Sequence, residues 1–174
     1  MTGRLGIDDV TPAVGDGRHP AKAVVGEVIP IGATVWREGH DAVAANAVWR
    51  RVGNRGPAHH VRMEQTGLGT DRFEAVVAAD EQGLWTFRVD AWSDPLATWR
   101  NAVTKKLDAG QSPEELANDL EIGARLLQRV GRRPAERPNR DLLFGAANAL
   151  RDTALPLHAR VAPARNDFLR EYFT

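Results

Sequence analysis

The sequence of 174 residues contains no cysteine, which excludes disulfide bonds and metal sites built on thiolate ligands. It also contains no apolar run close to the roughly 20 residues that a membrane-spanning helix needs. The first residues, M-T-G-R-L-G-I-D-D, include no apolar signal core. We therefore expect a cytoplasmic protein with no membrane partner.

The chain lacks a surplus of charge of either sign, because 23 basic residues balance 23 acidic ones. Binding to nucleic acid usually relies on a strong field of positive charge. We therefore expect no nucleic-acid partner. Aromatic residues make up only 6% of the chain, and five of them are tryptophans.

The segment of residues 83–99 carries the clearest structural signal. Apolar side chains first recur at every second position, as in a strand with one packed face. They are Trp85, Phe87, Val89 and Ala91. Asp94 and Pro95 then indicate a helix start, because Asp is a favoured N-cap and Pro fits the first helical position. The sequence predicts a β domain over residues 1–94 and a helical domain over residues 95–174.

Before residue 94, short apolar stretches separated by turn residues are typical of an antiparallel sandwich. Pro30 removes one ladder donor and therefore indicates a sheet edge or a bulge. The candidate strands span residues 4–10, 21–25, 26–36, 43–50, 61–65, 73–77 and 84–92.

Beyond residue 94 the apolar spacing is helical. The first predicted helix ends before Gly110, and the second begins at the capping box of Ser112 and Glu115 and ends near Gly131. The predicted helices span residues 95–109, 112–131, 140–151 and 167–173. The expected buried positions are Leu116, Leu120, Gly123, Leu127, Val130, Leu142, Leu143, Ala146 and Leu150. The apolar residues of the last helix, which have no obvious partner, are Phe168, Leu169, Tyr172 and Phe173.

The five tryptophans are candidates for stacking on a sugar ring or a base. Trp36, Trp49 and Trp85 fall at apolar strand positions, so we expect them to pack in the core. Trp92 and Trp99 flank the predicted domain junction, and we expect them to pack the two halves together rather than bind a ligand.

The histidines do not form a metal-ligand pattern. His59 and His60 are adjacent, so their side chains diverge in a strand or a helix, and we expect them in a solvated loop. His19, His40 and His158 have no partner at ligand spacing. We expect no metal site and no cofactor.

Three acidic pairs could in principle supply a general acid and a general base. They are Asp8 with Asp9, Glu114 with Glu115, and Asp119 with Glu121. Adjacent side chains diverge, and carboxylates near a helix start stabilise the helix dipole. We therefore predict no catalytic residue among them.

The glycine motifs G-D-G, G-N-R-G and G-L-G predict turns, because none joins a strand to a helix with phosphate-binding spacing. A basic loop could hold a phosphate or a partner carboxylate, but we interpret it as a solvated loop. Its arginines are Arg129, Arg132, Arg133, Arg137 and Arg140.

Four sequence blocks occur in a characteristic order. They are P-A-K-A-V-V-G-E-V-I-P-I-G-A-T-V-W-R-E-G-H-D at residues 20–41, G-L-W-T-F-R-V-D-A-W-S-D-P-L-A-T-W at 83–99, K-L-D-A-G-Q at 106–111 and L-A-N-D-L-E-I-G-A at 116–124. Together they resemble the N-terminal region of the α-1,4-glucan:maltose-1-phosphate maltosyltransferases, a family of the α-amylase superfamily (glycoside hydrolase family 13). The resemblance covers residues 3–130. The tail beyond Leu150 matches weakly, and the loop of residues 52–60 is shorter than usual.

The resemblance implies a place in the synthesis of glycogen-like α-glucan. Enzymes of this family transfer maltosyl units from maltose 1-phosphate to the non-reducing ends of α-1,4-glucans, with retention at the anomeric carbon. Their catalytic carboxylates lie on a (β/α)₈ barrel of about 250 residues. We expect that barrel to lie outside these 174 residues, so no catalytic residue can be assigned by number. In the family, the region that this chain resembles supports dimerisation and buttresses the active site, and the resemblance implies the same roles here.

The expected fold is α+β, with an N-terminal antiparallel immunoglobulin-like β-sandwich followed by a small helical bundle. The leading hypothesis is a non-catalytic part of a maltosyltransferase that forms a homodimer and is inactive alone. α-Glucan and maltose 1-phosphate would be substrates of the whole enzyme. In the family the chain returns to the sandwich with one more strand, so we expect an unpaired sheet edge and self-association here. The alternatives are a free-standing carbohydrate-binding module and a domain fused to a different catalytic unit.

Overall fold

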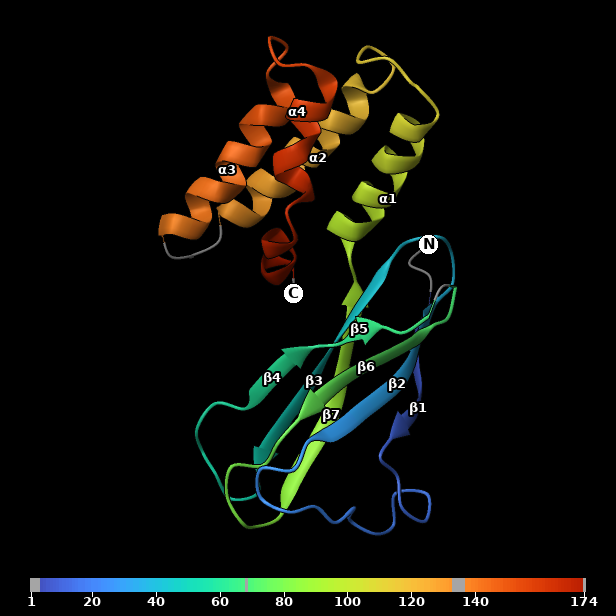
Figure 1. The fold of residues 1–174 in the computed structure, drawn as a ribbon, viewed down its shortest axis with the longest axis vertical. Helices are drawn as coiled ribbons and strands as arrows, with labels where there is room; N and C mark the ends of the chain where they lie inside the picture. The colour runs from blue at the N-terminus through green and yellow to red at the C-terminus, as the bar shows by residue number, and fades with distance from the viewer. Residues whose placement is uncertain (1–3, 68, 133–136, 174) are drawn as a thin grey trace. The chain divides into compact units, whose positions relative to one another are not determined.

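The computed structural model describes residues 4–67, 69–132 and 137–173, without the side chains of residues 137–139. The chain divides into two compact units, Met1–Ser93 and Asp94–Thr174. The first unit consists of strands and the second of helices, and each has an apolar core of its own (Figure 1). The fold therefore belongs to the α+β class, as the sequence predicts.

The first unit contains two antiparallel sheets. One has the strand order β1-β2-β6-β5 and the other β4-β3-β7. Alternating residues of both sheets build one core, in which Ala33, Val35, Ala45 and Ala47 are fully buried. The strands are β1 (Leu5–Thr11), β2 (Ile29–Arg37), β3 (Val43–Arg51), β4 (His59–Arg62), β5 (Glu64–Gln65), β6 (Arg72–Val77) and β7 (Trp85–Ser93).

The single strand predicted over residues 61–65 is wrong, because the chain changes sheets within it. His59–Arg62 pairs with β3, whereas Glu64–Gln65 pairs with β6 in the other sheet. Met63 lies between them with 1% of its surface exposed, and its backbone N–H donates to the Ala45 carbonyl at 2.9 Å. A residue buried at the crossing thus divides one apolar stretch between two sheets.

The strand predicted over residues 21–25 is also wrong. All five residues are exposed, and a turn forms instead. The Val24 N–H donates to the Glu27 carboxylate at 2.7 Å, the Glu27 N–H donates to the Val24 carbonyl, and Gly26 takes the left-handed φ of 80°. This turn satisfies locally the backbone groups that a strand would pair across a sheet.

Pro30 lies inside β2, which is an interior strand. The pairing of β2 with β1 ends at Thr11 and Gly32, so Pro30 lies beyond the end of β1. The irregularity in this ladder lies in β1, between Asp8 and Thr11. The missing donor of Pro30 therefore interrupts no described pair between β1 and β2.

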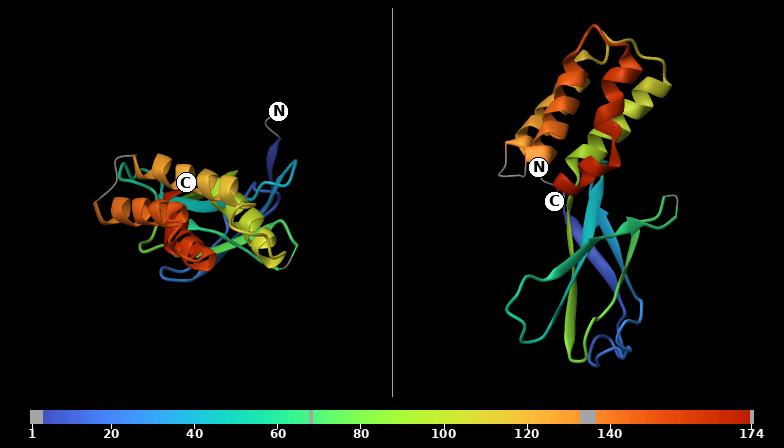
Figure 2. Two further views of the ribbon diagram at one scale, coloured as in Figure 1. Left: turned by 90° about the horizontal axis from the view of Figure 1, so that it is seen from above. Right: turned by 60° about the vertical axis from the view of Figure 1, so that its left-hand side comes forward.

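The second unit is helical, and α2 and α3 run side by side in Figures 1 and 2. The predicted start of α1 is confirmed, because the Asp94 carboxylate accepts from the Ala97 N–H at 2.9 Å. Ser112 and Glu115 exchange the two bonds of a capping box, but α2 begins only at Ala117. The helices are α1 (Pro95–Asp108), α2 (Ala117–Gly131), α3 (Arg137–Arg151), α4 (Leu157–Val161) and two 3₁₀ helices, η1 (Ala162–Arg165) and η2 (Asp167–Tyr172).

The C-terminal segment packs more closely than the sequence predicts. Leu169 and Phe173 are 2% and 5% exposed and belong to the core of the helical unit, whereas Phe168 is 69% exposed. Leu142, expected to be buried in α3, is 53% exposed. The short elements α4 and η1 were not predicted. Pro163 lies in the first turn of η1, where a helix tolerates proline.

Candidate functional site

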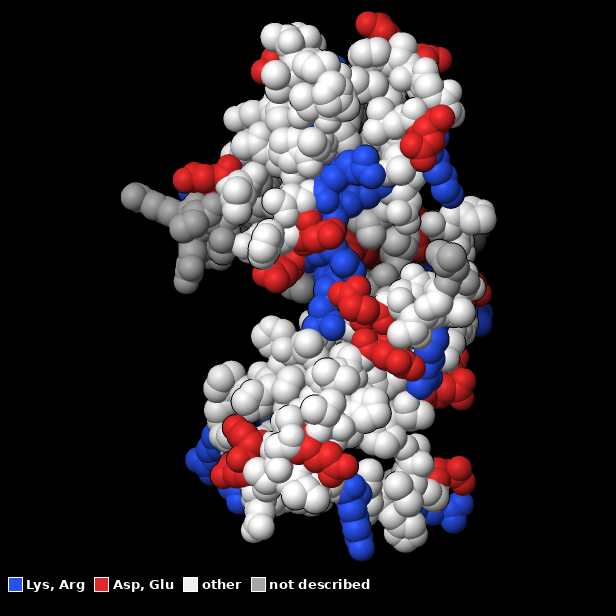
Figure 3. Space-filling model, in the orientation of Figure 1, with Lys and Arg blue, Asp and Glu red and all other residues white. Residues whose placement is uncertain are grey.

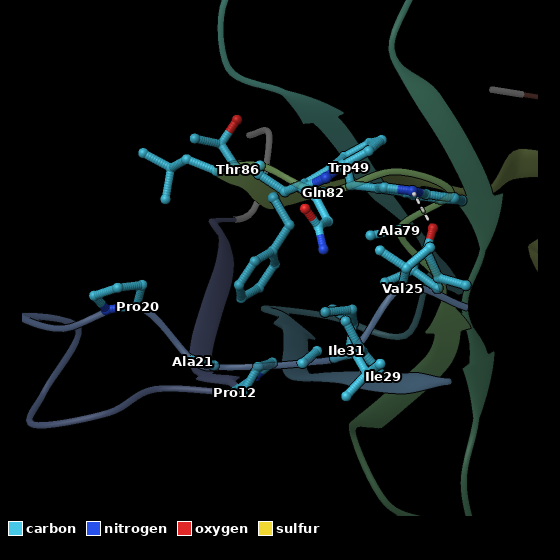
Figure 4. Close-up of a pocket in the computed structure, with 18 of the residues that line it drawn as sticks. Pro12, Pro20, Ala21, Val25, Ile29, Ile31, Trp49, Ala79, Gln82 and Thr86 are labelled. Atoms are coloured by element: carbon cyan, nitrogen blue, oxygen red, sulfur yellow. Dashed lines mark hydrogen bonds between the residues drawn. The ribbon is translucent and has the colours of Figure 1, made fainter. Parts of the chain in front are cut away.

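A pocket of about 770 Å³ opens at one end of the sheet unit. It forms where the ends of β2, β6 and β7 meet the segment before β2 (Figure 4). We call it the sheet-end pocket, and its apolar lining includes Ile29, Ile31, Trp49, Val77, Trp85 and Phe87. Concave apolar sites of this size are typical of small-molecule binding sites.

Strand register brings the aromatic side chains of the pocket together. Trp49 on β3 lies opposite Phe87 on β7 and opposite His59 on β4. The Trp49 and His59 rings are stacked with centroids 5.3 Å apart, and the His59 and Trp85 centroids are 6.0 Å apart. The loop predicted for His59 and His60 is therefore wrong, because both lie in β4, although both are exposed.

The polar groups around the pocket are few and mostly paired. The Trp49 indole N–H donates to the Ala78 carbonyl at 3.2 Å, and the Trp85 indole N–H donates to the Glu81 carbonyl at 3.2 Å. The Glu81 carboxylate pairs with Arg51 at 3.5 Å. Figure 4 shows the Gln82 amide directed into the pocket. The site thus combines aromatic faces with three uncharged polar side chains, Gln82, His19 and Thr86.

The tryptophans contribute to their own units. Trp36, Trp49 and Trp85 are all half-buried. Trp49 packs against the sheet core, as predicted, whereas Trp36 and Trp85 lie outside that core. Trp99 is 5% exposed in the helical core, and its indole N–H donates to the Asp119 carbonyl at 2.7 Å. The Arg62 guanidinium lies over the Trp92 ring, with its central carbon 5.5 Å from the ring centroid.

The acidic pairs serve as hydrogen-bond and ion-pair partners. Asp8 accepts from the Trp36 indole at 2.5 Å, and Asp119 accepts from the Lys106 ammonium at 2.7 Å. Glu121 accepts from Arg151 and Arg125, and these hydrogen bonds lower its pKa to about 2. Across residues 4–67, 69–132 and 137–173, His, Asp and Glu side chains form no group of three that could hold a metal ion.

The predicted basic loop falls partly outside the described residues, since Arg133 lies there and the side chain of Arg137 is not described. The Arg140 guanidinium lies 5.4 Å from the Phe144 ring centroid, and Arg132 is exposed. Arg129 is exposed in the last turn of α2. The described part therefore presents no converging arginine site.

Arg100 was not predicted, and it connects α1 to the C-terminal segment. Its guanidinium donates to the Ala164 carbonyl at 2.9 Å and to the Asn166 carbonyl at 2.5 Å, and it lies 3.5 Å from the Asp167 carboxylate. Burial lowers the pKa of this guanidinium, partly offset by Asp167. Its partners are mainly backbone carbonyls more than 60 positions away, so no local pattern identifies it.

The sheet-end pocket was also not predicted. The segments T-P-A-V-G-D-G-R-H-P and A-A-D-E-Q-G contain typical turn residues and were interpreted only as turns. Both contribute lining residues, among them Pro12 and Gln82. Only the tertiary structure places these turns beside the aromatic side chains of β3 and β7.

Comparison with known proteins identifies the family. Residues 3–174 match the family of domain N/S of α-1,4-glucan:maltose-1-phosphate maltosyltransferase. The chain belongs to this family. The match extends through residue 174, so the resemblance seen over residues 3–130 continues into the tail.

Full-length relatives are similar along nearly the whole chain. The maltosyltransferase of Corynebacterium pseudotuberculosis is 45% identical over 171 residues, which cover 98% of this chain and 25% of that protein. The enzyme of Mycolicibacterium smegmatis is 44% identical, and the match covers 99% of this chain and 29% of that protein. The enzyme of Myxococcus xanthus is 36% identical, and the match covers 96% of this chain and 26% of that protein. The chain thus spans about a quarter of the length of these relatives.

Proposed function

We propose that this chain is the non-catalytic N-terminal part of a maltosyltransferase that transfers maltosyl units from maltose 1-phosphate to α-1,4-glucans. The domain N/S match over residues 3–174 carries this proposal. In this view the two sheets form an immunoglobulin-like sandwich and the helices form a small bundle. The boundary between these domains lies near residue 94, and the transfer chemistry resides in the remaining three quarters of the enzyme, which is cytoplasmic and makes glycogen-like α-glucan.

A transfer assay tests this function. The 174-residue chain is incubated with maltose 1-phosphate and a maltooligosaccharide, and released phosphate is measured. We expect no release above the blank, while a full-length relative in the same assay serves as the positive control. Turnover by the 174-residue chain alone would contradict the proposal.

We also propose that this part supports homodimerisation and buttresses the active site of the whole enzyme. Several apolar side chains of the sheet unit are strongly exposed, which is typical of surfaces that contact another chain. They are Val24, Val28, Val76 and Leu84, with exposed fractions between 59% and 73%. Light scattering over a concentration series is expected to detect self-association, and a monomeric mass at every concentration would contradict it.

Neither nucleic acid nor a membrane is a proposed partner. On the face drawn in Figure 3, both units carry Lys and Arg interspersed with Asp and Glu, without a large area of one sign. Among the described residues, the helices are all too short or too polar to cross a bilayer. A free-standing carbohydrate-binding module is not favoured either, because Trp99 is buried and Arg62 lies over Trp92.

A further inference from the structure

We propose that the sheet-end pocket binds a small uncharged molecule with an apolar, ring-shaped body and one hydrogen-bonding end. This ligand is neither of the two substrates of maltosyl transfer. The proposal rests on the size of the pocket, its chemistry and the way its walls are held.

The shape and lining of the pocket favour an apolar body. Its volume of about 770 Å³ lies within the range of small-molecule sites. Trp49 and Phe87 lie opposite each other on neighbouring strands, and Ile29, Ile31 and Val77 come from the facing sheet. Phe87 is 37% exposed, although it alternates with polar residues along β7 in the way that a core-facing residue does. A ring placed here would cover aromatic and aliphatic surface that the chain itself leaves open.

The distribution of hydrogen-bonding groups disfavours a sugar. Both indole N–H groups are already donated to backbone carbonyls, those of Ala78 and Glu81. The Glu81 carboxylate is paired with Arg51. A pyranose buried here would bring several hydroxyls to a wall that offers few partners, and each unmatched hydroxyl would weaken binding.

The Gln82 amide supplies a hydrogen-bonding contact, and it is directed into the pocket in Figure 4. His19 and Thr86 are the other uncharged polar side chains of the lining. An amide both donates and accepts, so it fits a hydroxyl, a carbonyl or an amide on the ligand. The lining carries no Lys or Arg, and its one carboxylate, Glu81, is paired with Arg51, so it offers no unpaired permanent charge that would neutralise a charged ligand.

The walls are held in place without a ligand. The Gly26 N–H donates to the Ala79 carbonyl at 2.9 Å, which joins the segment before β2 to the loop after β6. The Val52 N–H donates to the Leu84 carbonyl at 2.8 Å, which anchors the start of β7. The stacked His59 ring supports Trp49 on β3. A preformed site of this kind loses little conformational freedom on binding.

NMR titration of the complete chain tests the proposal. The probes are p-cresol, toluene and maltotriose, and the signals are the five indole N–H groups and the Gln82 side-chain amide. We expect p-cresol to cause saturable shifts at Trp49, Trp85 and Gln82. Trp36 and Trp99 lie outside the lining, so their indole signals act as internal controls. Maltotriose should shift none of these signals.

Three variants separate the pocket from other causes. Ala79→Leu fills the pocket and should weaken p-cresol binding by at least about tenfold, since filling an apolar site excludes the ligand body. Val76→Leu is the matched control, because Val76 lies near the same end of β6 but is 60% exposed and outside the lining. This variant should leave p-cresol binding unchanged. Gln82→Leu should weaken p-cresol binding but not toluene binding.

Three results would overturn the proposal. They are saturable shifts with maltotriose at the pocket signals, no saturable shift with either ring compound, and unchanged p-cresol binding in a folded Ala79→Leu variant. None of these results depends on transfer activity. The titration therefore tests the pocket even if the chain is not part of a maltosyltransferase.

Discussion

At the scale of single residues, close approaches decide which side chains this fold accepts. Gly123 of α2 lies against the buried Trp99 ring, and a Cβ built there would be 2.4 Å from ring atoms. Gly6 faces the Trp36 ring at the same distance. Periodicity alone predicted Gly123 as a buried position, but only the structure identifies the ring that requires glycine.

The substitution Gly123→Ala is therefore expected to destabilise the helical unit by about 1–3 kcal/mol, because the Trp99 ring has no room to move in a packed core. Gly145→Ala is the matched control. Gly145 lies in the interior of α3 with nothing within 4 Å of its Cβ position, so alanine should stabilise by up to about 1 kcal/mol. Urea unfolding followed by circular dichroism measures both. An equal change in the free energy of unfolding for Gly123→Ala and Gly145→Ala would show that the Trp99 ring does not restrict position 123.

Glu121 gives a prediction about pH. Hydrogen bonds from Arg151 and Arg125 lower its pKa from 4.5 to about 2 in the folded chain. A carboxyl with a depressed folded pKa contributes stability that is present above pH 4.5 and is lost as the pH falls towards 2. We expect the carboxyl carbon of Glu121 to titrate near pH 2 by NMR. Glu121→Gln should reduce the loss of folding stability between pH 4.5 and 2. A Glu121 carboxyl that titrates near 4.5 would show that the hydrogen bonds from Arg151 and Arg125 do not form in solution.

At the scale of elements, helix ends follow local chemistry. Asp94 is 1% exposed and accepts from the Ala97 N–H, while Pro95 occupies the first helical position. Gly110, just beyond α1, takes a φ of 74°. These features need only neighbouring residues, and they were correctly predicted from the sequence.

Removing the cap of α1 should lower stability. Asp94→Ala leaves a buried helix end without its acceptor, and we expect a loss of about 1–2 kcal/mol in the free energy of unfolding. Asp94→Asn keeps an oxygen at the same position and should cost less. Chemical denaturation of both variants tests this, and a larger loss for Asn than for Ala would exclude capping as the reason.

The C-terminal segment depends on Arg100. Arg100→Met keeps much of the buried aliphatic stem but removes the bonds to the Ala164 and Asn166 carbonyls. We expect faster amide hydrogen exchange across η1 and η2, with α2 and α3 little changed. Arg132→Met, at an exposed position, is the control. Equal protection of the segment in the variant and the wild type would show that its apolar contacts alone hold it.

At the scale of the whole molecule, two cores lie in two consecutive stretches of chain. The sheet core involves residues before 94 and the helical core residues after it. We predict that each part folds alone and that the complete chain unfolds in two steps. Separate expression of residues 1–93 and 94–174 tests this by circular dichroism. A helical part beginning at residue 95 lacks its cap and should unfold earlier, and a single cooperative transition of the complete chain would count against independence.

The sequence by itself determined the α+β class, the point where strands give way to helices and the chemistry of the helix ends. Those features depend on periodicity and on hydrogen bonds between near neighbours. The tertiary structure alone decided the sheet change at Met63, the burial of Leu169 and Phe173, and the sheet-end pocket. Each of these joins residues from distant parts of the chain, and one strand or turn in isolation has no partner to reveal them. The pocket in particular exists because Trp49 of β3 and Phe87 of β7 meet Gln82 of the loop before β7 and the strand ends of the facing sheet only in the folded unit.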